Sequence, residues 1–351
     1  MGREFSSDHV APACDAILAA VNAANEGFVT SYGGDDLTAT LQSVASEVFE
    51  KQVTVFPVIS GTAANALALS QIVPTFGAIY CYELAHIITD EAGAPGFFTG
   101  GAQLIGFPSP DGKIKPEQLT RAVAFAGDLG IHHVKPGAVT LTQATEWGTV
   151  YSLEEIEAIS AIAKQYRLPV HIDGARFANA LAHLGCTPAE ATWKRGVDVL
   201  SLGATKNGAL GADAVVFFDP EIARDFERRR KRAGHLMSKL RFVSAQLVAY
   251  LRNDLWLNNA RHANAMAARM AKGLKGMAAV RLLRQVDANE LFLEVPERIA
   301  AGLEAQGFHF YRWQYLVAES GVTIRLVTSF ATTAADVDEF LAAISALKMA
   351  G

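Results

Sequence analysis

The stretch at residues 200–211, LSLGATKNGALG, places a single lysine, Lys206, among small and apolar residues, directly after an apolar run that is typical of a strand. A lysine on a glycine-rich turn is usually a surface residue. A lysine that is held partly away from water, however, has an amine that can be neutral and nucleophilic. Which description applies to Lys206 depends on what the rest of the chain brings near it.

The composition excludes several classes of protein. The chain has 351 residues, half of them hydrophobic, and a net charge of −5, so it can form a large domain and a smaller one. This charge does not favour nucleic acid as a partner. No apolar run is long enough for a membrane span, and the start MGREFSSDHV is unlike a signal peptide. The nine histidines lack zinc-binding spacing, so no metal site is expected. Three widely spaced cysteines, Cys14, Cys81 and Cys186, predict reduced thiols in the cytoplasm.

Short apolar runs alternate with helix-forming segments over the first two thirds of the chain. The predicted strands lie at residues 53–60, 138–145, 168–173, 197–203 and 214–219. Between two of them, Ser152 and Glu155 form a capping box at the start of a helix. This order predicts an α/β fold, with a mainly parallel sheet that helices cover on both faces.

The pattern changes after residue 220. A long helical segment begins with the basic run ERRRKR (227–232), and the last hundred residues mix helix-like pieces with strands such as NELFLEV and VTIRLVT. We therefore predict a large domain at residues 1–253 and a small α/β domain at residues 254–351. The basic run is either a solvated helix face or a set of phosphate ligands, in this subunit or in a neighbour.

Polar residues follow three of the predicted strands directly, where ligands gather in α/β proteins. Gly61 and Thr62 open a helix, and the backbone N–H groups at such a position can bind an anion. Asp173 ends a strand, and Lys206 follows the next one. A turn or a helix cap explains each feature alone. Together, an anion site, an aspartate and an isolated lysine are the groups that hold pyridoxal phosphate (PLP).

These residues also carry a resemblance to a known family. The chain resembles the threonine aldolases, fold type I PLP enzymes of the β-eliminating lyase superfamily, and is most similar to the low-specificity and phenylserine aldolase branch. The resemblance implies a large PLP-binding domain and a smaller C-terminal domain. The matching segments, in family order, are SSDHV, SYGGDDLTATL, ISGTAANALAL, AHIITDEAGAP, TQATEWGTVYSLEEI, HIDGARFANAL, GATKNG, RRKRAGHLMSKLRF and IRLVTSFATT.

The resemblance assigns residues to the cofactor. Lys206 matches the Schiff-base lysine, and Asp173 matches the partner of the pyridine nitrogen. Gly61 and Thr62 match the phosphate cradle, and His86 matches the histidine that stacks on the cofactor ring. Arg232 and Lys239, in RRKRAGHLMSKLRF, match basic groups that reach the cofactor phosphate of a neighbouring subunit.

The resemblance also assigns residues to the substrate. Ser7, Arg176 and Arg325 match the groups that hold its carboxylate. His133 matches a histidine near the substrate hydroxyl, with His132 as the competing choice. The base that takes the β-hydroxyl proton stays open among His86, His133 and an ordered water.

The implied activity is cleavage of β-hydroxy-α-amino acids, such as L-threonine, L-allo-threonine or phenylserine, to glycine and an aldehyde. A homodimer or homotetramer with sites at the interface is also implied. The alternatives are a β-eliminating lyase or an aminotransferase of the same fold, a nucleotide-dependent oxidoreductase and a noncatalytic scaffold. The absence of GxGxxG argues against the oxidoreductase, and a scaffold leaves Lys206 unexplained.

Overall fold

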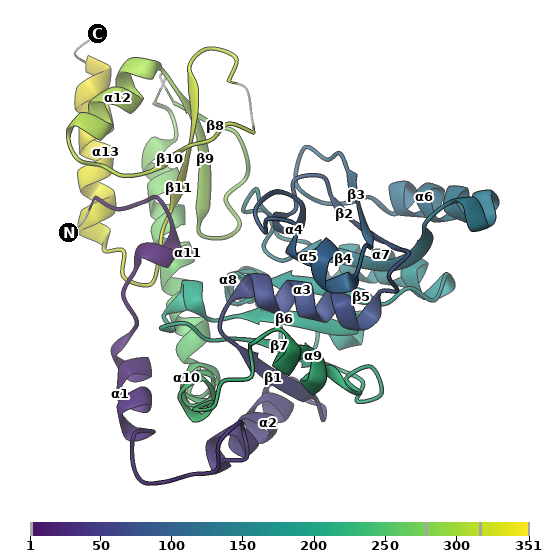
Figure 1. The fold of residues 1–351 in the computed structure, drawn as a ribbon. Helices are drawn as coiled ribbons and strands as arrows, with labels where there is room; N and C mark the ends of the chain where they lie inside the picture. Colours follow the sequence, from purple (N-terminus) through teal and green to yellow (C-terminus); the bar gives the residue numbers. More distant parts are fainter. Residues whose placement is uncertain (1–2, 278–279, 316–317, 350–351) are drawn as a thin grey trace.

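Two sheets with their covering helices form the protein (Figure 1). The structure is a computed structural model that describes residues 3–277, 280–315 and 318–349. In the described chain, the larger sheet has the strand order β1-β7-β6-β5-β4-β2-β3, and the smaller sheet has the order β10-β11-β9-β8. None of the described helices is long and apolar enough to cross a membrane.

The larger sheet is mainly parallel, as predicted. Its reversed strand is β7, which runs antiparallel to both β6 and β1. Each predicted strand has a counterpart here, whereas β2 and β3 were not predicted. For β2 the reason is that the helix before it is equally apolar, so hydrophobic periodicity does not show where the helix ends and the strand begins. The strands are β1 (Thr54–Val58), β2 (Gly77–Tyr82), β3 (Gln103–Phe107), β4 (Lys135–Thr142), β5 (Val170–Gly174), β6 (Val199–Gly203) and β7 (Asp213–Phe217).

Helices pack on both faces of the larger sheet because successive side chains of its buried strands point to opposite sides. Val215 packs in one apolar cluster with α3 and α9. Val216 packs in another cluster with α2 and α10. The helices of this unit are α1 (Asp15–Ala23), α2 (Asp36–Val48), α3 (Gly61–Ile72), α4 (His86–Thr89), α5 (Ala94–Thr99), α6 (Pro116–Leu129), α7 (Leu153–Gln165), α8 (Phe177–Leu184), α9 (Phe226–Arg232) and α10 (Arg241–Leu251).

The smaller sheet packs its two faces against different partners. Leu291 and Leu293 contribute to an apolar core with α11, α12 and α13. Phe292, between them, faces the larger unit and lies 4.8 Å from the Trp147 ring. Arg325 pairs with Phe292 in the sheet. The elements are α11 (Leu255–Leu274), β8 (Arg281–Leu282), β9 (Glu290–Val295), α12 (Glu297–Ala305), β10 (Tyr311–Arg312), β11 (Val322–Val327) and α13 (Ala334–Met349).

The N-terminal segment joins the smaller unit. Phe5 is fully buried in the apolar core of that unit. Its backbone N–H donates to the carbonyl of His309 at 2.8 Å, and its carbonyl accepts from the N–H of Val327 at 2.8 Å. In Figure 1 the purple start of the chain lies beside the yellow end. The domain division at residue 253 stays a prediction, but the first residues do not pack with the larger unit alone.

Candidate active site

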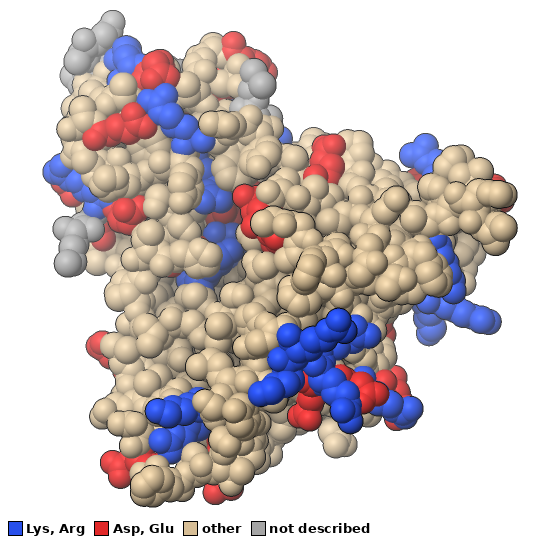
Figure 2. Space-filling view, in the orientation of Figure 1, with Lys and Arg blue, Asp and Glu red and all other residues tan. Residues whose placement is uncertain are grey.

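A cavity of about 930 Å³ lies between the carboxyl ends of the large-sheet strands and the smaller sheet. Figure 2 shows basic side chains gathered in the recess between the two units. The cavity brings together most of the residues predicted for the site. Those that line it are Ser7, Gly61, Thr62, His86, Asp173, Arg176, Lys206 and Arg325.

Lys206 lies just past the end of β6, in the short 3₁₀ helix η4 (Thr205–Asn207). None of the ion pairs among the described residues includes Lys206. Burial lowers the pKa of its amine, and repulsion from Arg176 lowers it further. This direction agrees with the prediction of a lysine that is held partly away from water and is easily made neutral.

Asp173 is the last residue but one of β5, and its carboxylate is buried and fixed from two sides. Its Oδ1 accepts from the backbone N–H of Ala175 at 3.0 Å, and its Oδ2 accepts from the Asn65 side-chain amide at 2.8 Å. The same amide nitrogen donates to Glu91 Oε1 at 2.9 Å. Glu91 in turn bonds the ring Nδ1 of His86 at 2.9 Å. A continuous chain of hydrogen bonds therefore connects the predicted pyridine partner to the predicted stacking histidine.

The contact with Glu91 orients the His86 ring. Its hydrogen bond raises the pKa of His86 despite the opposing effect of burial. Burial raises the pKa of Glu91. Because Glu91 accepts at Nδ1, the ring keeps its proton on that nitrogen when it is neutral.

The start of α3 has the features of an anion site. The Ser60 side chain caps the helix by accepting from the backbone N–H of Ala63. The hydrogen bonds of the described residues include none from the N–H groups of Gly61 and Thr62. A Cβ placed on Gly61 would meet no atom within 4 Å, so the space beside this glycine is open. Two free donors and the positive end of the helix dipole favour a phosphate there.

Arg325 projects from β11 toward the cavity between two aromatic rings. Its guanidinium carbon lies 5.0 Å from the Tyr311 ring centre and 4.8 Å from that of Trp313. One terminal nitrogen donates to the Ser6 carbonyl at 3.2 Å. The nearest carboxylate is Glu290, at 3.7 Å. The guanidinium is thus oriented by its neighbours without a close bidentate carboxylate partner in the described chain.

Arg176 has a different set of contacts. Its Nε and Nη2 donate to the two oxygens of Asp8 at 2.8 and 3.0 Å, and its Nη1 lies 3.2 Å from Glu290. Burial alone would lower the pKa of Arg176, but these carboxylates outweigh it and raise that pKa. The fork of Arg176 that would pair with a substrate carboxylate is bonded to Asp8 in this structure, and its role as a substrate ligand stays a prediction.

Three other predicted residues lie away from this cavity. His133 precedes β4, whereas Thr142 at the other end of that strand lines the cavity. Seven residue steps along a strand span roughly 23 Å, so neither His133 nor the competing His132 reaches the site of its own chain. Arg232 and Lys239 are both exposed and do not line the cavity. Arg232 is the last residue of α9 and Lys239 lies between α9 and α10; their role toward a neighbouring subunit stays a prediction. Figure 2 shows a basic patch in the region of α9.

Several residues of the site were not predicted from the sequence, namely Asp8, His9, Asn65, Glu91, Glu146, Glu290, Tyr311 and Trp313. Most of them contact another residue of the site and do not stand out in the sequence as isolated polar residues in an apolar stretch. The one signal in the sequence is Asn65, a polar residue within the otherwise small and apolar segment TAANALAL that follows a predicted strand.

Comparison with known proteins agrees with this geometry. The family model for beta-eliminating lyases matches residues 4–298. A low specificity L-threonine aldolase of a Pseudomonas species is 41% identical over 99% of this chain and 99% of its own length. The chain belongs to the threonine aldolase family, within the beta-eliminating lyases.

Two further threonine aldolases support this membership. The low specificity L-threonine aldolase of Pseudomonas aeruginosa is 43% identical, and the match covers 88% of this chain and 89% of that protein. The threonine aldolase of Leishmania major is 28% identical and superposes with a TM-score of 0.92 over 98% of this chain and 99% of that structure. The predicted fold type I architecture is thereby confirmed.

Proposed function

We propose that this protein is a PLP-dependent aldolase that cleaves L-threonine and related β-hydroxy-α-amino acids to glycine and an aldehyde. The observation that carries the proposal is the placement of Lys206, Asp173 and the open start of α3 around one cavity. Release of glycine from L-threonine by the purified protein with added PLP tests it. A protein that releases no glycine under these conditions would contradict it.

The residues of the cavity fit PLP. The free N–H groups of Gly61 and Thr62 would bind the phosphate, and Lys206 would bond covalently to the cofactor aldehyde. The Asp173 carboxylate would accept a hydrogen bond from the pyridine nitrogen, and the His86 ring would stack on the cofactor face. When bound, the cofactor supplies an electron sink for the bond pair that is released at Cα.

Asn65 offers a test of cofactor binding, because its amide fixes the Asp173 carboxylate. We expect Asn65→Ala to weaken PLP binding by roughly ten- to a hundredfold, since hydrogen bonds to charged groups contribute about 1.5–3 kcal/mol. Equilibrium dialysis of PLP measures the change. Asn179→Ala is a matched control, because Asn179 is also buried but bonds Asn264 instead. If both variants bind PLP as the wild type does, Asn65 does not support the cofactor site.

Arg325 is the residue that we assign to the substrate carboxylate, together with Ser7, which also lines the cavity. Arg176 stays a candidate at the same place, and it would orient Asp8 and Glu290 through its own ion pairs. A fixed carboxylate sets the rotation of the substrate and therefore which bond at Cα is broken. The aromatic residues Tyr311 and Trp313 also line the cavity, which supports the acceptance of large β-substituents such as a phenyl group.

Arg325→Lys should lower kcat/KM by at least roughly tenfold, and Arg325→Ala should lower it further. Lysine keeps the charge but lacks the planar fork that pairs with a carboxylate, and about 1.36 kcal/mol corresponds to a factor of ten. Steady-state kinetics with L-threonine measures the loss. PLP binding should be unchanged in both variants. A normal kcat/KM for the lysine variant, or a loss of PLP binding, would rule out the carboxylate role.

We also propose that the protein is a cytoplasmic homodimer or homotetramer. Large apolar side chains on the surface support an oligomer, since Phe28 and Phe97 are strongly exposed in the single chain. The cysteines support a reducing compartment, because Cys14, Cys81 and Cys186 are all free. Light scattering coupled to size exclusion measures the number of subunits.

A further inference from the structure

Glu146 holds a position in the cavity that none of the proposed roles uses. It follows β4 on the loop between β4 and α7, and it lines the cavity. Its Oε1 accepts from the Thr142 hydroxyl at 2.7 Å and from the backbone N–H of His86 at 3.1 Å. These two donors fix the carboxyl group beside the histidine that we place against the cofactor ring.

The second oxygen of Glu146 lacks a partner. Oε2 is buried and accepts no hydrogen bond from the described residues. Leaving a buried polar atom unpaired costs about 1–3 kcal/mol, so such an atom calls for an explanation. Glu146 lines the cavity while Oε2 itself is covered, so this oxygen can gain a ligand as its partner when the carboxyl group turns toward the cavity.

Other carboxylates of the cavity also have a free oxygen, but each faces a basic group. Glu91 bonds the His86 ring at 2.9 Å, and Glu290 lies 3.2 Å from Arg176. The ion pairs of the described residues do not include Glu146. Among the described residues, Glu146 is therefore the carboxylate of these three whose buried free oxygen has no basic group beside it.

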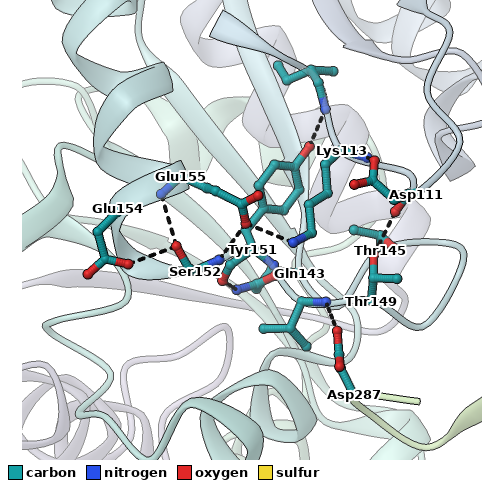
Figure 3. Close-up of polar contacts among 12 residues, drawn as sticks. Asp111, Lys113, Gln143, Thr145, Thr149, Tyr151, Ser152, Glu154, Glu155 and Asp287 are labelled. Carbon is teal, nitrogen blue, oxygen red and sulfur yellow. Dashed lines mark hydrogen bonds and ion pairs between the residues drawn. The ribbon is translucent and has the colours of Figure 1, made fainter. Parts of the chain in front are cut away.

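The loop that carries Glu146 is held rigidly (Figure 3). The Gln143 side chain donates to the Tyr151 carbonyl at 2.9 Å and accepts from the Tyr151 N–H at 3.0 Å. The Thr145 and Thr149 hydroxyls bond each other at 2.8 Å. The Tyr151 hydroxyl accepts from the backbone of the 109–115 segment at 2.7 Å. A group on such a loop keeps its position through a reaction cycle, which a proton-transfer residue needs.

The surroundings of Glu146 place its titration near neutral pH. Burial raises its pKa to about 7, and repulsion from Asp173 on β5 adds to the rise, while the Thr142 hydroxyl opposes it. The other titratable residues near it are Cys81 and Tyr82 on β2 and Tyr151 after the loop, whose pKa values the charge of Glu146 raises, and His86 on α4, whose backbone N–H it bonds. A base that titrates close to the working pH is efficient in proton transfer.

We infer that Glu146 is the catalytic base that takes the β-hydroxyl proton of the substrate. The inference rests on the proposed aldolase function. In the cleavage direction the hydroxyl proton passes to the Glu146 carboxylate, and the O–H electron pair forms the second bond of the aldehyde C=O. The Cα–Cβ bond breaks and its electron pair stays at Cα, where a proton later replaces the lost carbon. In synthesis, Glu146 returns its proton to the aldehyde oxygen.

The first test separates hydroxyl chemistry from the rest of the cycle. Glu146→Gln keeps the shape of the side chain, and it should lower cleavage of L-threonine by about 10²- to 10⁴-fold. Exchange of the glycine Cα hydrogen with D₂O involves no β-hydroxyl, so it should stay within about threefold of the wild type. Glu83→Gln is the control, because Glu83 is exposed on the neighbouring β2–α4 loop and does not line the cavity.

Three outcomes would overturn the inference. Cleavage by Glu146→Gln within a few-fold of the wild type would exclude a base at this position. An equal loss of cleavage and glycine exchange would make Glu146 a structural or cofactor residue. In the wild type, kcat/KM should fall at low pH, where the base becomes protonated. If this fall disappears in His86→Gln but remains in Glu146→Gln, His86 is the base. A wild-type protein that releases no glycine contradicts the proposed function instead.

A second test needs no activity. A carboxyl group whose pKa rises on folding lowers stability as pH increases from its ordinary pKa toward its folded pKa. Glutamine does not titrate, so the Tm of Glu146→Gln minus that of the wild type should grow between about pH 5 and pH 7 and then level off. The measurement uses the cofactor-free protein in thermal melts. A Tm difference that does not change with pH would show that Glu146 does not titrate in this range, and the inference would fail.

Discussion

Lys206→Ala is expected to reduce L-threonine cleavage at least about a thousandfold. The amine of Lys206 would both attach the cofactor and transfer a proton at Cα, and a positioned proton-transfer group alone contributes about 10²- to 10⁴-fold. The protein should still fold, because Lys206 makes no ion pair in the described chain. Removing a buried amine with a lowered pKa should not destabilise the fold.

Borohydride reduction followed by peptide mass spectrometry checks this assignment. The wild type should carry the reduced cofactor on the peptide that contains Lys206, and the alanine variant should carry none. Lys206→Arg should fail like alanine, because a guanidinium stays protonated and is not a nucleophile. Lys194→Ala, an exposed residue paired with Glu50, should behave as the wild type. Labelling of another lysine in the wild type would refute the assignment.

Asp173→Asn should have the second largest effect, a loss of about 10²- to 10⁴-fold in turnover. Asp173 is buried, and an uncharged amide does not stabilise a protonated pyridine nitrogen. Breaking a buried charge pair costs about 3–5 kcal/mol, and about 1.36 kcal/mol corresponds to a factor of ten in rate. Single-turnover kinetics at saturating PLP measures the loss.

Asp198→Asn provides the matched control for this substitution. Asp198 precedes β6 and accepts from the Val170 N–H at 2.8 Å, at the opposite end of the same strands. Its replacement should affect stability but leave turnover within a few-fold of the wild type. If Asp173→Asn turns over threonine as fast as Asp198→Asn does, the pyridine nitrogen has another partner.

The sequence predicted which isolated residues at strand ends would line the cavity. Lys206, Asp173 and Gly61 each follow an apolar run, and the rule that ligands gather at the carboxyl ends of parallel strands brings them together. The same rule argues against His133, because this histidine precedes the strand that ends at Thr142. The family resemblance suggested His133, whereas the direction of the strand places it at the far edge of the sheet.

The sequence did not predict the contacts between distant residues. Arg176 pairs with Asp8 across 168 positions, and Asn65 bonds Asp173 across 108. Such pairs depend on how the N-terminal segment and α3 pack over the sheet, and hydrophobic periodicity does not contain that information. The role of Glu146 depends on burial, because the same residue on a solvated loop would have an ordinary carboxyl pKa.

The most direct test of the central claim is the product balance of the wild-type protein with L-threonine and PLP, followed by NMR. An aldolase produces glycine and acetaldehyde in equal amounts, with no keto acid and no ammonia. A β-eliminating lyase would release ammonia and a keto acid, and an aminotransferase would need a second keto acid. We predict one glycine for each acetaldehyde from the first minutes onward. Formation of ammonia or a keto acid in place of glycine would contradict the account.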